Sequence, residues 1–218
     1  FVQQGWSLKK LHRLITTSAT YAQASDVSPE LLEKDPANRF LARGARHRVE
    51  AEMVRDSVLA ASGLLSSKMY GPPVYPPQPA YVYEGAYGGG EWPTSQGEDR
   101  YRRSIYTFLK RSAPFAMYNT FDAPSGEVCL ARREVSNTPL QSLTLLNDPM
   151  FLEAAQRLGA EVAALEMPDA AKMKTLFRRC LTRSPAATEL ERLLGFVASQ
   201  RNRIRSGALK AADLSPAE

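Results

Sequence analysis

A chain of 218 residues is long enough to bury a full hydrophobic core. Its composition, with 44% hydrophobic and 23% charged residues, is ordinary for a globular protein. The net charge of +5 is mildly basic. Because 28 basic residues stand against 23 acidic ones and are scattered along the sequence, we expect no nucleic-acid partner. No apolar run reaches the roughly 20 residues of a membrane-spanning helix, so no span is expected.

The first residues, Phe-Val-Gln-Gln-Gly, are typical of the last turn of a helix that ends at Gly5. This pattern indicates a piece of a longer protein, in which any targeting segment would lie upstream. Ser7 then predicts a helix with Leu8, Leu11, Leu14 and Ile15 along one side. Ser28-Pro29 predicts a second, short helix.

The next helix is expected from about residue 48 to residue 62, ending at Gly63. Arg48, Glu52 and Arg55 fall along one edge of it, at spacings that allow them to pair. Two interpretations stay open. Together with Arg46, Glu50 and Asp56, these residues could hold an anionic or hydroxylated ligand through guanidinium groups, or they could form an ion-pair network that ties the helix to its neighbours. The second interpretation is the commoner case and is favoured.

Residues 70–97 have a different character, because prolines, tyrosines and the Gly88–Gly90 run leave no room for a helix. We expect one long irregular inserted loop. Its aromatic side chains, including Tyr81, Tyr83 and Trp92, could stack on sugars or pack against a neighbouring domain. Residues 102–111, which follow, alternate enough for a short strand but are also compatible with one helical turn.

The stretch 119–155 is the densest in polar groups and turn signals. Asp122 and Glu127 could act as paired carboxylates in sugar chemistry, and a basic pair follows them. The catalytic candidates are therefore Asp122, Glu127, Arg132 and Arg133, and the ligand-binding candidates are Arg48, Glu52, Arg55, Tyr81, Tyr83, Trp92, Gln141 and Asn147. More often, however, such loop residues cap helices and satisfy backbone groups.

Two helix starts follow in this stretch, at Thr138-Pro139 and at Asp148-Pro149, where proline occupies the first helical position. Leucines between them supply an apolar face. Three helices are then predicted, over about 149–166, over about 169–182, and after Ser184-Pro185, with a frayed tail over 206–218. The fold class is mainly α: a single helical domain over 1–218 with the loop 70–97 and at most a short strand pair.

Several sites are excluded by missing motifs. The chain has no Gly-rich phosphate loop, no paired Cys-x-x-Cys spacing for zinc and only two histidines, so no metal site is expected. It also lacks Cys-x-x-Cys-His, so that no haem c can attach covalently within this segment. Its two cysteines, Cys129 and Cys180, could pair if the fold joins them. Two separate thiols, with Cys180 buried on a helix, are the more ordinary expectation.

Four stretches carry a resemblance to a known family: residues 1–21, 38–65, 97–155 and 181–194. Together they resemble the uncharacterised C-terminal domain, domain of unknown function fifteen-fifty-three, of large planctomycete-type secreted proteins. The likeness covers nearly the whole chain. It supplies no established catalytic residues, so whether the chain takes part in catalysis stays open.

The resemblance implies an extracytoplasmic protein, in the periplasm or at the cell surface, in which another helical domain precedes this one. It also implies a cytochrome c-like module elsewhere in the parent protein, which would hold haem c, and a role in redox chemistry or degradation of polysaccharide. On this basis we expect a module that completes a site or an interface with the preceding helical domain. The alternatives are a purely structural or interaction module, and a carbohydrate-binding surface.

Overall fold

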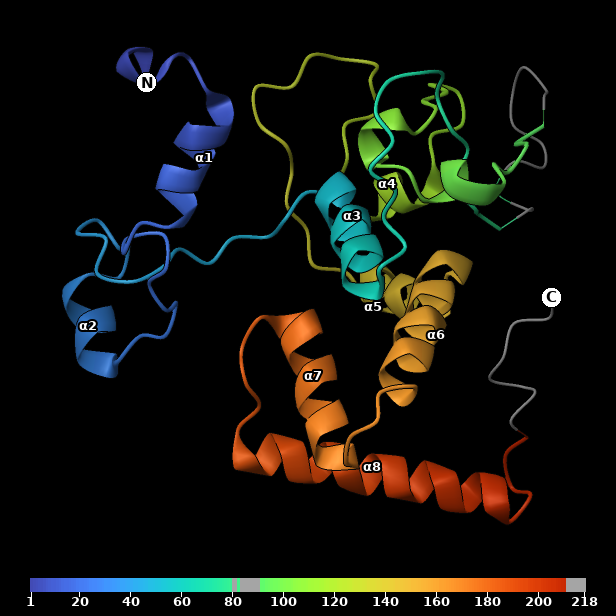
Figure 1. Ribbon diagram of the computed structural model, residues 1–218. Helices are drawn as coiled ribbons and strands as arrows, with labels where there is room; N and C mark the ends of the chain where they lie inside the picture. Colours follow the sequence, from blue (N-terminus) through green and yellow to red (C-terminus); the bar gives the residue numbers. More distant parts are fainter. Residues whose placement is uncertain (80–81, 83–90, 211–218) are drawn as a thin grey trace. The chain divides into compact units, whose positions relative to one another are not determined.

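The structure is a computed structural model that describes residues 1–79, 82 and 91–210 (Figure 1). The chain separates into two compact units, Phe1–Arg48 and Val49–Glu218. Helices dominate both units, and the expected mainly α fold is confirmed. The expectation of one domain over 1–218 stays a prediction.

Unit 1 contains a 3-10 turn, η1 (Val2–Gln4), and two helices, α1 (Leu8–Thr16) and α2 (Pro29–Lys34). Both helices begin where their capping serines predict. The hydroxyl of Ser7 accepts from the Lys10 amide, and that of Ser28 accepts from the Leu31 amide. After α2, the buried carboxylate of Asp35 accepts two backbone amides and thereby fixes the following turn.

Unit 2 holds the larger part of the fold. Its elements are α3 (Ala51–Ser62), η3 (Gly97–Tyr101), η4 (Ser104–Tyr106), α4 (Ala116–Thr120), α5 (Pro139–Asn147), α6 (Pro149–Ala163), α7 (Asp169–Leu181) and α8 (Ala187–Arg205). Helix α3 packs against α4 and α6, α6 packs against α5 and α7, and α8 packs against α7. In Figure 1 the long helix α8 runs across the end of α7. None of the helices described is long and apolar enough to cross a membrane.

Local signals set the ends of these helices. Gly63 ends α3 with φ +74°, a backbone conformation that costs glycine little. Thr138 and Gln141 form a reciprocal capping box at the start of α5. The carboxylate of Asp148 accepts from the Met150 amide at the start of α6. The predicted helix starts at Pro139 and Pro149 are therefore confirmed.

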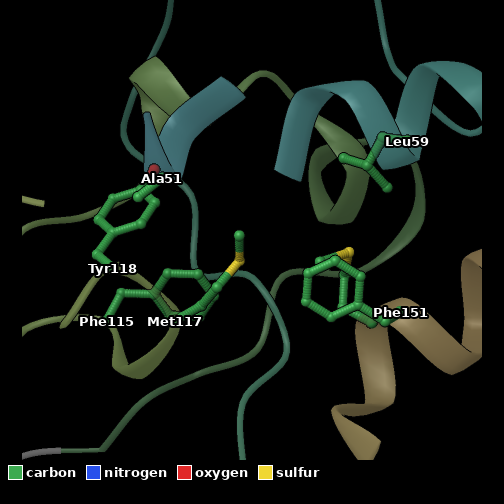
Figure 2. Close-up of a cluster of buried hydrophobic side chains, with 7 residues drawn as sticks. Ala51, Leu59, Phe115, Met117, Tyr118 and Phe151 are labelled. Atoms are coloured by element: carbon green, nitrogen blue, oxygen red, sulfur yellow. The ribbon is translucent and has the colours of Figure 1, made fainter. Parts of the chain in front are cut away.

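The core of unit 2 lies between α3, α4 and α6 (Figure 2). Its buried members come from these three helices and the residue before α4: Ala51, Leu59, Phe115, Met117, Tyr118, Met150 and Phe151. The Phe115 ring is central, because the Trp92 ring stacks on it at 5.8 Å and the Tyr118 ring meets it edge-on at 5.2 Å. The indole of Trp92 also donates to the Pro76 carbonyl. Through Trp92, the irregular segment before η3 is therefore attached to the core.

Residues 102–111 do not form the short strand that was one of two expectations for them. Residues Ser104–Tyr106 form a 3-10 turn, and beyond it Thr107 makes a single parallel bridge to Val74. This bridge is the only β pairing among the residues described. Tertiary hydrogen bonds, and not a sheet, therefore hold this part of the backbone.

The cysteines remain separate thiols, as expected. Both Cys129 and Cys180 are free and exposed. The expectation that Cys180 is buried is wrong, since this residue lies on the outer side of α7.

Candidate functional site

Arg55 is the most deeply buried charged residue of the candidate set. It lies on the inner stripe of α3 between Ala51 and Leu59, with its relative exposure at 0%. Its two terminal nitrogens donate to the Arg102 carbonyl (2.6 Å) and the Arg100 carbonyl (3.0 Å). Burial lowers the pKa of this guanidinium, and the nearby Tyr118 and Asp56 oppose that effect. The expected position of Arg55 at the edge of the helix is therefore wrong.

Arg102 repeats this arrangement at 1% exposure. Its guanidinium donates to the carbonyls of Tyr70 and Pro72 and lies 3.8 Å from the centre of the Tyr106 ring. The two buried arginines thus bind backbone carbonyls of the irregular segments around residues 70–72 and 100–102, and they fix the path of the main chain there. We name this pair, Arg55 and Arg102, the guanidinium clamp.

Glu52 pairs with a residue far away in the sequence. Arg133 donates from both terminal nitrogens to the Glu52 carboxylate, at 2.7 and 3.1 Å, and lies 3.5 Å from Glu50. Partial burial of Glu52 opposes ionisation, but the hydrogen bonds from Arg133 outweigh it, so that the pKa of Glu52 is lowered. The ion-pair network expected for this helix is present, but the partner of Glu52 is Arg133. Neither Arg48 nor Arg55 takes that role.

This lowered pKa makes a pH-dependent contribution to stability. A carboxylate with a lowered pKa in the folded state stabilises the fold above its ordinary value of 4.5, and this contribution is lost as the pH falls through the lower folded value. Glu52→Gln should therefore lower the free energy of unfolding at pH 7 by at most about 1 kcal/mol, because the pair is partly exposed. The difference from the parent should shrink toward acidic pH, about 3, where the carboxylate is increasingly protonated.

Urea unfolding at neutral and at acidic pH tests this pair. The matched control is Glu166→Gln, at an exposed residue with no ion pair in the described chain, and it should show no such pH dependence. A Glu52→Gln effect that stayed constant between the two pH values would contradict the assignment of the ion pair.

Asp122 forms the second polar centre of the site. It has φ +60°, and its carboxylate accepts from both the amide (2.7 Å) and the hydroxyl (2.8 Å) of Ser136. The side-chain amide of Gln141, which is 4% exposed, donates to the Thr120 carbonyl and to the Ser136 hydroxyl. Together these bonds join the end of α4 to the start of α5. The Asp122 carboxylate acts here as an acceptor that fixes the loop.

A pocket of about 260 Å³ lies beside Asp122. The residues that line it are Asn119, Asp122, Ala123, Pro124, Ser125, Leu130 and Glu134. Of the four catalytic candidates, Asp122 alone contributes to this lining. Glu127, the expected carboxylate partner of Asp122, is exposed and does not line the pocket.

Similarity to a known protein family extends over most of the chain. A model of the family described as PSD1, protein of unknown function (DUF1553), matches residues 1–197. The chain belongs to this family. No curated protein and no solved structure matches it. The family match confirms that the chain is a domain of the uncharacterised DUF1553 family, as the resemblance implied. It assigns no reaction to the chain.

The remaining candidates of this DUF1553 chain have other surroundings. Asn147 donates to the Leu143 carbonyl within α5, Arg132 is exposed, and Arg48 is exposed in unit 1. One stacked face of Trp92 is covered by Phe115. Tyr81 and Tyr83 lie outside the described residues. Over the described ranges, no three His, Cys, Asp or Glu side chains gather closely enough to hold a metal ion.

One polar cluster was not predicted from the sequence. Glu153 on α6 accepts a bidentate pair of hydrogen bonds from Arg100 and a 2.5 Å bond from the Tyr101 hydroxyl. These contacts attach η3 to α6. The partners are more than 50 residues apart, and no local pattern marks them.

Proposed function

We propose that this DUF1553 chain is an interaction module, which docks on another helical domain of its parent protein through the outer face of α5. The observation that carries the proposal is the burial pattern of α5. The buried residue of this helix is the polar Gln141, whereas all four of its leucines are exposed. Leu140, Leu143, Leu145 and Leu146 have relative exposures of 58%, 55%, 44% and 69%.

This pattern is the reverse of what the core of a single domain requires. Burying a leucine side chain stabilises by about 1.5–3 kcal/mol, and α5 leaves most of that stabilisation unused. Leu140, Leu143 and Leu146 recur every three residues, a spacing suited to packing against a second helix. Val128 and Leu130, in the segment before α5, are exposed as well. Exposed apolar surface of this kind marks sites of protein–protein contact.

The polar candidate residues support the same function, because their side chains already bind other groups of this chain. Arg133 is bound by Glu52, and Asp122 is bound by Ser136, both within the chain itself. Arg55 donates to backbone carbonyls. These groups therefore act as internal supports of the fold, which favours an interaction module over a contributor to a catalytic site.

The family resemblance suggests the partner and the setting. We propose that the partner is the helical domain that precedes this one in the parent chain, and that the parent is an extracytoplasmic protein. On the same basis we propose that a cytochrome c-like module, with its haem c, belongs to the parent, and that the assembly acts on or near polysaccharide.

Hydrogen exchange of the amides of α5 tests the interface. In the parent protein these amides should exchange more slowly than in the 218-residue chain alone, because the partner covers the helix. The double variant Leu143→Glu/Leu146→Glu should remove that difference, while the circular dichroism of the chain stays unchanged, since both side chains are exposed.

The matched control is Ile105→Glu/Phe196→Glu, which adds the same charges at two other exposed apolar residues of unit 2. This variant should leave the protection of α5 in the parent protein intact. Equal exchange of α5 in the parent and in the isolated chain would overturn the proposed interface.

A further inference from the structure

A groove of about 250 Å³ lies where α6, α7 and α8 meet (helices labelled in Figure 1). Its α6 wall is formed by Gly159, Val162 and Ala163, and its α8 wall by Val197 and Arg201. On each helix these residues are three or four positions apart, so they form one stripe on α6 and one on α8. Well-packed helices leave few voids larger than a water molecule, so a space of this size has room for a ligand. We name it the three-helix groove.

The α7 wall of this groove changes from polar to apolar along the helix. It consists of Asp169, Lys172, Met173 and Leu176, whose spacing places them on one face of α7. Asp169 and Lys172 lie in the first turn, and Met173 and Leu176 follow toward the middle of the helix. The stripe covers about 10 Å along the helix axis. Arg201 pairs with Asp169, so the charged residue of the α8 wall lies at the same, polar end.

The other end of the groove is apolar. Val162 of α6 is buried there, at 3% exposure. Met173, Leu176 and Val197 line the groove and are half-buried. No residue of α7 or α8 that the structure describes is fully buried. These side chains therefore keep apolar surface in contact with water, and a hydrocarbon chain in the groove would cover it.

The polar end carries a surplus positive charge, because two cations face one carboxylate. Arg201 donates from both terminal nitrogens to the Asp169 carboxylate. These hydrogen bonds lower the pKa of Asp169, and the charge of Lys172 adds to this effect. Lys172 itself donates to the Ala163 carbonyl at 2.6 Å and makes no salt bridge within the described chain. An ammonium group has further N–H donors beyond this one, and they are available to a ligand.

We infer that the three-helix groove binds a short aliphatic carboxylate, with its carboxylate at Lys172 and its hydrocarbon chain along Met173 and Leu176. The surplus charge selects an anion, and the apolar end selects a hydrocarbon. The groove, at about 250 Å³, is slightly smaller than the roughly 300–1,000 Å³ of pockets for drug-sized ligands, so it fits a small molecule. An α-helix of a partner protein, about 10–12 Å across, is too thick for it.

The experiment compares octanoate with octan-1-ol, which has a hydrocarbon chain of the same length and no charge. Binding is read by NMR from isotope-labelled methyl groups of the six methionines in the 218-residue chain. The Met173 methyl resonance should shift with octanoate and reach a plateau, because this residue lines the groove. The methyl of Met53, which is exposed on α3, should not shift and reports non-specific binding to apolar surface. Octan-1-ol should bind about tenfold more weakly, since it lacks the charged hydrogen bond to Lys172.

Gly159→Leu tests the position of the site. A Cβ atom at Gly159 meets no other atom within 4 Å, so a leucine fits there and occupies part of the groove. Leucine also favours a helix more than glycine does, so the fold should be retained. This variant should lose the shift of Met173 on addition of octanoate. The matched control is Gly195→Leu, at a glycine of α8 that has equally open surroundings and does not line the groove. It should bind octanoate as the parent does.

Lys172→Gln tests the charge at the polar end. It should weaken the binding of octanoate by about tenfold and leave that of octan-1-ol unchanged, since only the carboxylate contacts Lys172. The matched control is Lys174→Gln, at an exposed lysine of α7 outside the groove, and it should change neither affinity.

The inference is wrong if the Met173 resonance reaches no plateau with octanoate, or if Met53 shifts as strongly as Met173. Equal affinities for octanoate and octan-1-ol would overturn the assignment of a carboxylate ligand. Equal losses in Gly159→Leu and Gly195→Leu would overturn the position of the site. None of these substitutions lies on α5, so the exchange experiment tests the proposed interface separately.

Discussion

Replacing Arg55 by methionine should lower the free energy of unfolding by about 2–5 kcal/mol, because two buried carbonyls lose their donor. Methionine fills a similar space, so the loss comes mainly from hydrogen bonds and less from a cavity. The carbonyls of Arg100 and Arg102 would stay buried without their charged donor. Each unsatisfied buried group costs about 1–3 kcal/mol. This loss of stability should exceed the loss caused by the same substitution at any arginine outside the guanidinium clamp.

Urea unfolding followed by tryptophan fluorescence measures this loss, because Trp92 is stacked in the same core. The control is Arg157→Met on α6, where the arginine is more than half exposed and pairs with Glu161 one turn away. This control should change stability by about 0.5 kcal/mol or less. Similar small losses in both variants would contradict the clamp.

The second large effect is expected at Phe115. Phe115→Ala removes a fully buried ring that contacts both Trp92 and Tyr118, and it should cost about 3–5 kcal/mol. The loss combines the lost burial of the ring with the cavity left between α3 and the aromatic segment. Trp92 would also lose its stacked neighbour, so its emission should shift in the folded state itself.

Phe196→Ala is the matched control for that variant. It deletes the same ring from α8, where the side chain is 63% exposed, and should change stability by less than about 1 kcal/mol. Thermal unfolding of the two variants side by side separates core packing from a general effect of losing phenylalanine. An equal loss in both would show that Phe115 is not central to the core.

The elements that were predicted correctly from the sequence are those whose signals are local. Ser7, Ser28 and Asp148 accept backbone amides two or three residues ahead, and Pro139 and Pro149 begin their helices as expected. Such contacts depend on neighbouring residues alone. The helix ends were therefore predicted to within a few residues.

The site was predicted less well, because its contacts are long-range. Glu52 and Arg133 are 81 residues apart, and Arg55 reaches a carbonyl 47 residues away. A carbonyl is present on every residue, so no residue type marks such an acceptor. The pattern of α3 placed Arg55 at an edge, whereas the fold places it on the inner stripe.

The apolar pattern of α5 illustrates a different limit. Periodicity correctly indicates an apolar face on this helix, but it does not state what covers that face. The arrangement of the helices decides that the leucines of α5 stay exposed.

The guanidinium clamp has a consequence for how this part of the family can diverge. Its acceptors are the main-chain oxygens of residues 70, 72, 100 and 102, which any amino acid supplies equally well. Arg102 is itself part of the clamp and Arg100 pairs with Glu153, so the clamp leaves the side chains of residues 70 and 72 free to vary as long as the path of the chain is kept. At residues 70 and 72 the clamp therefore requires a main-chain path and no particular side chain.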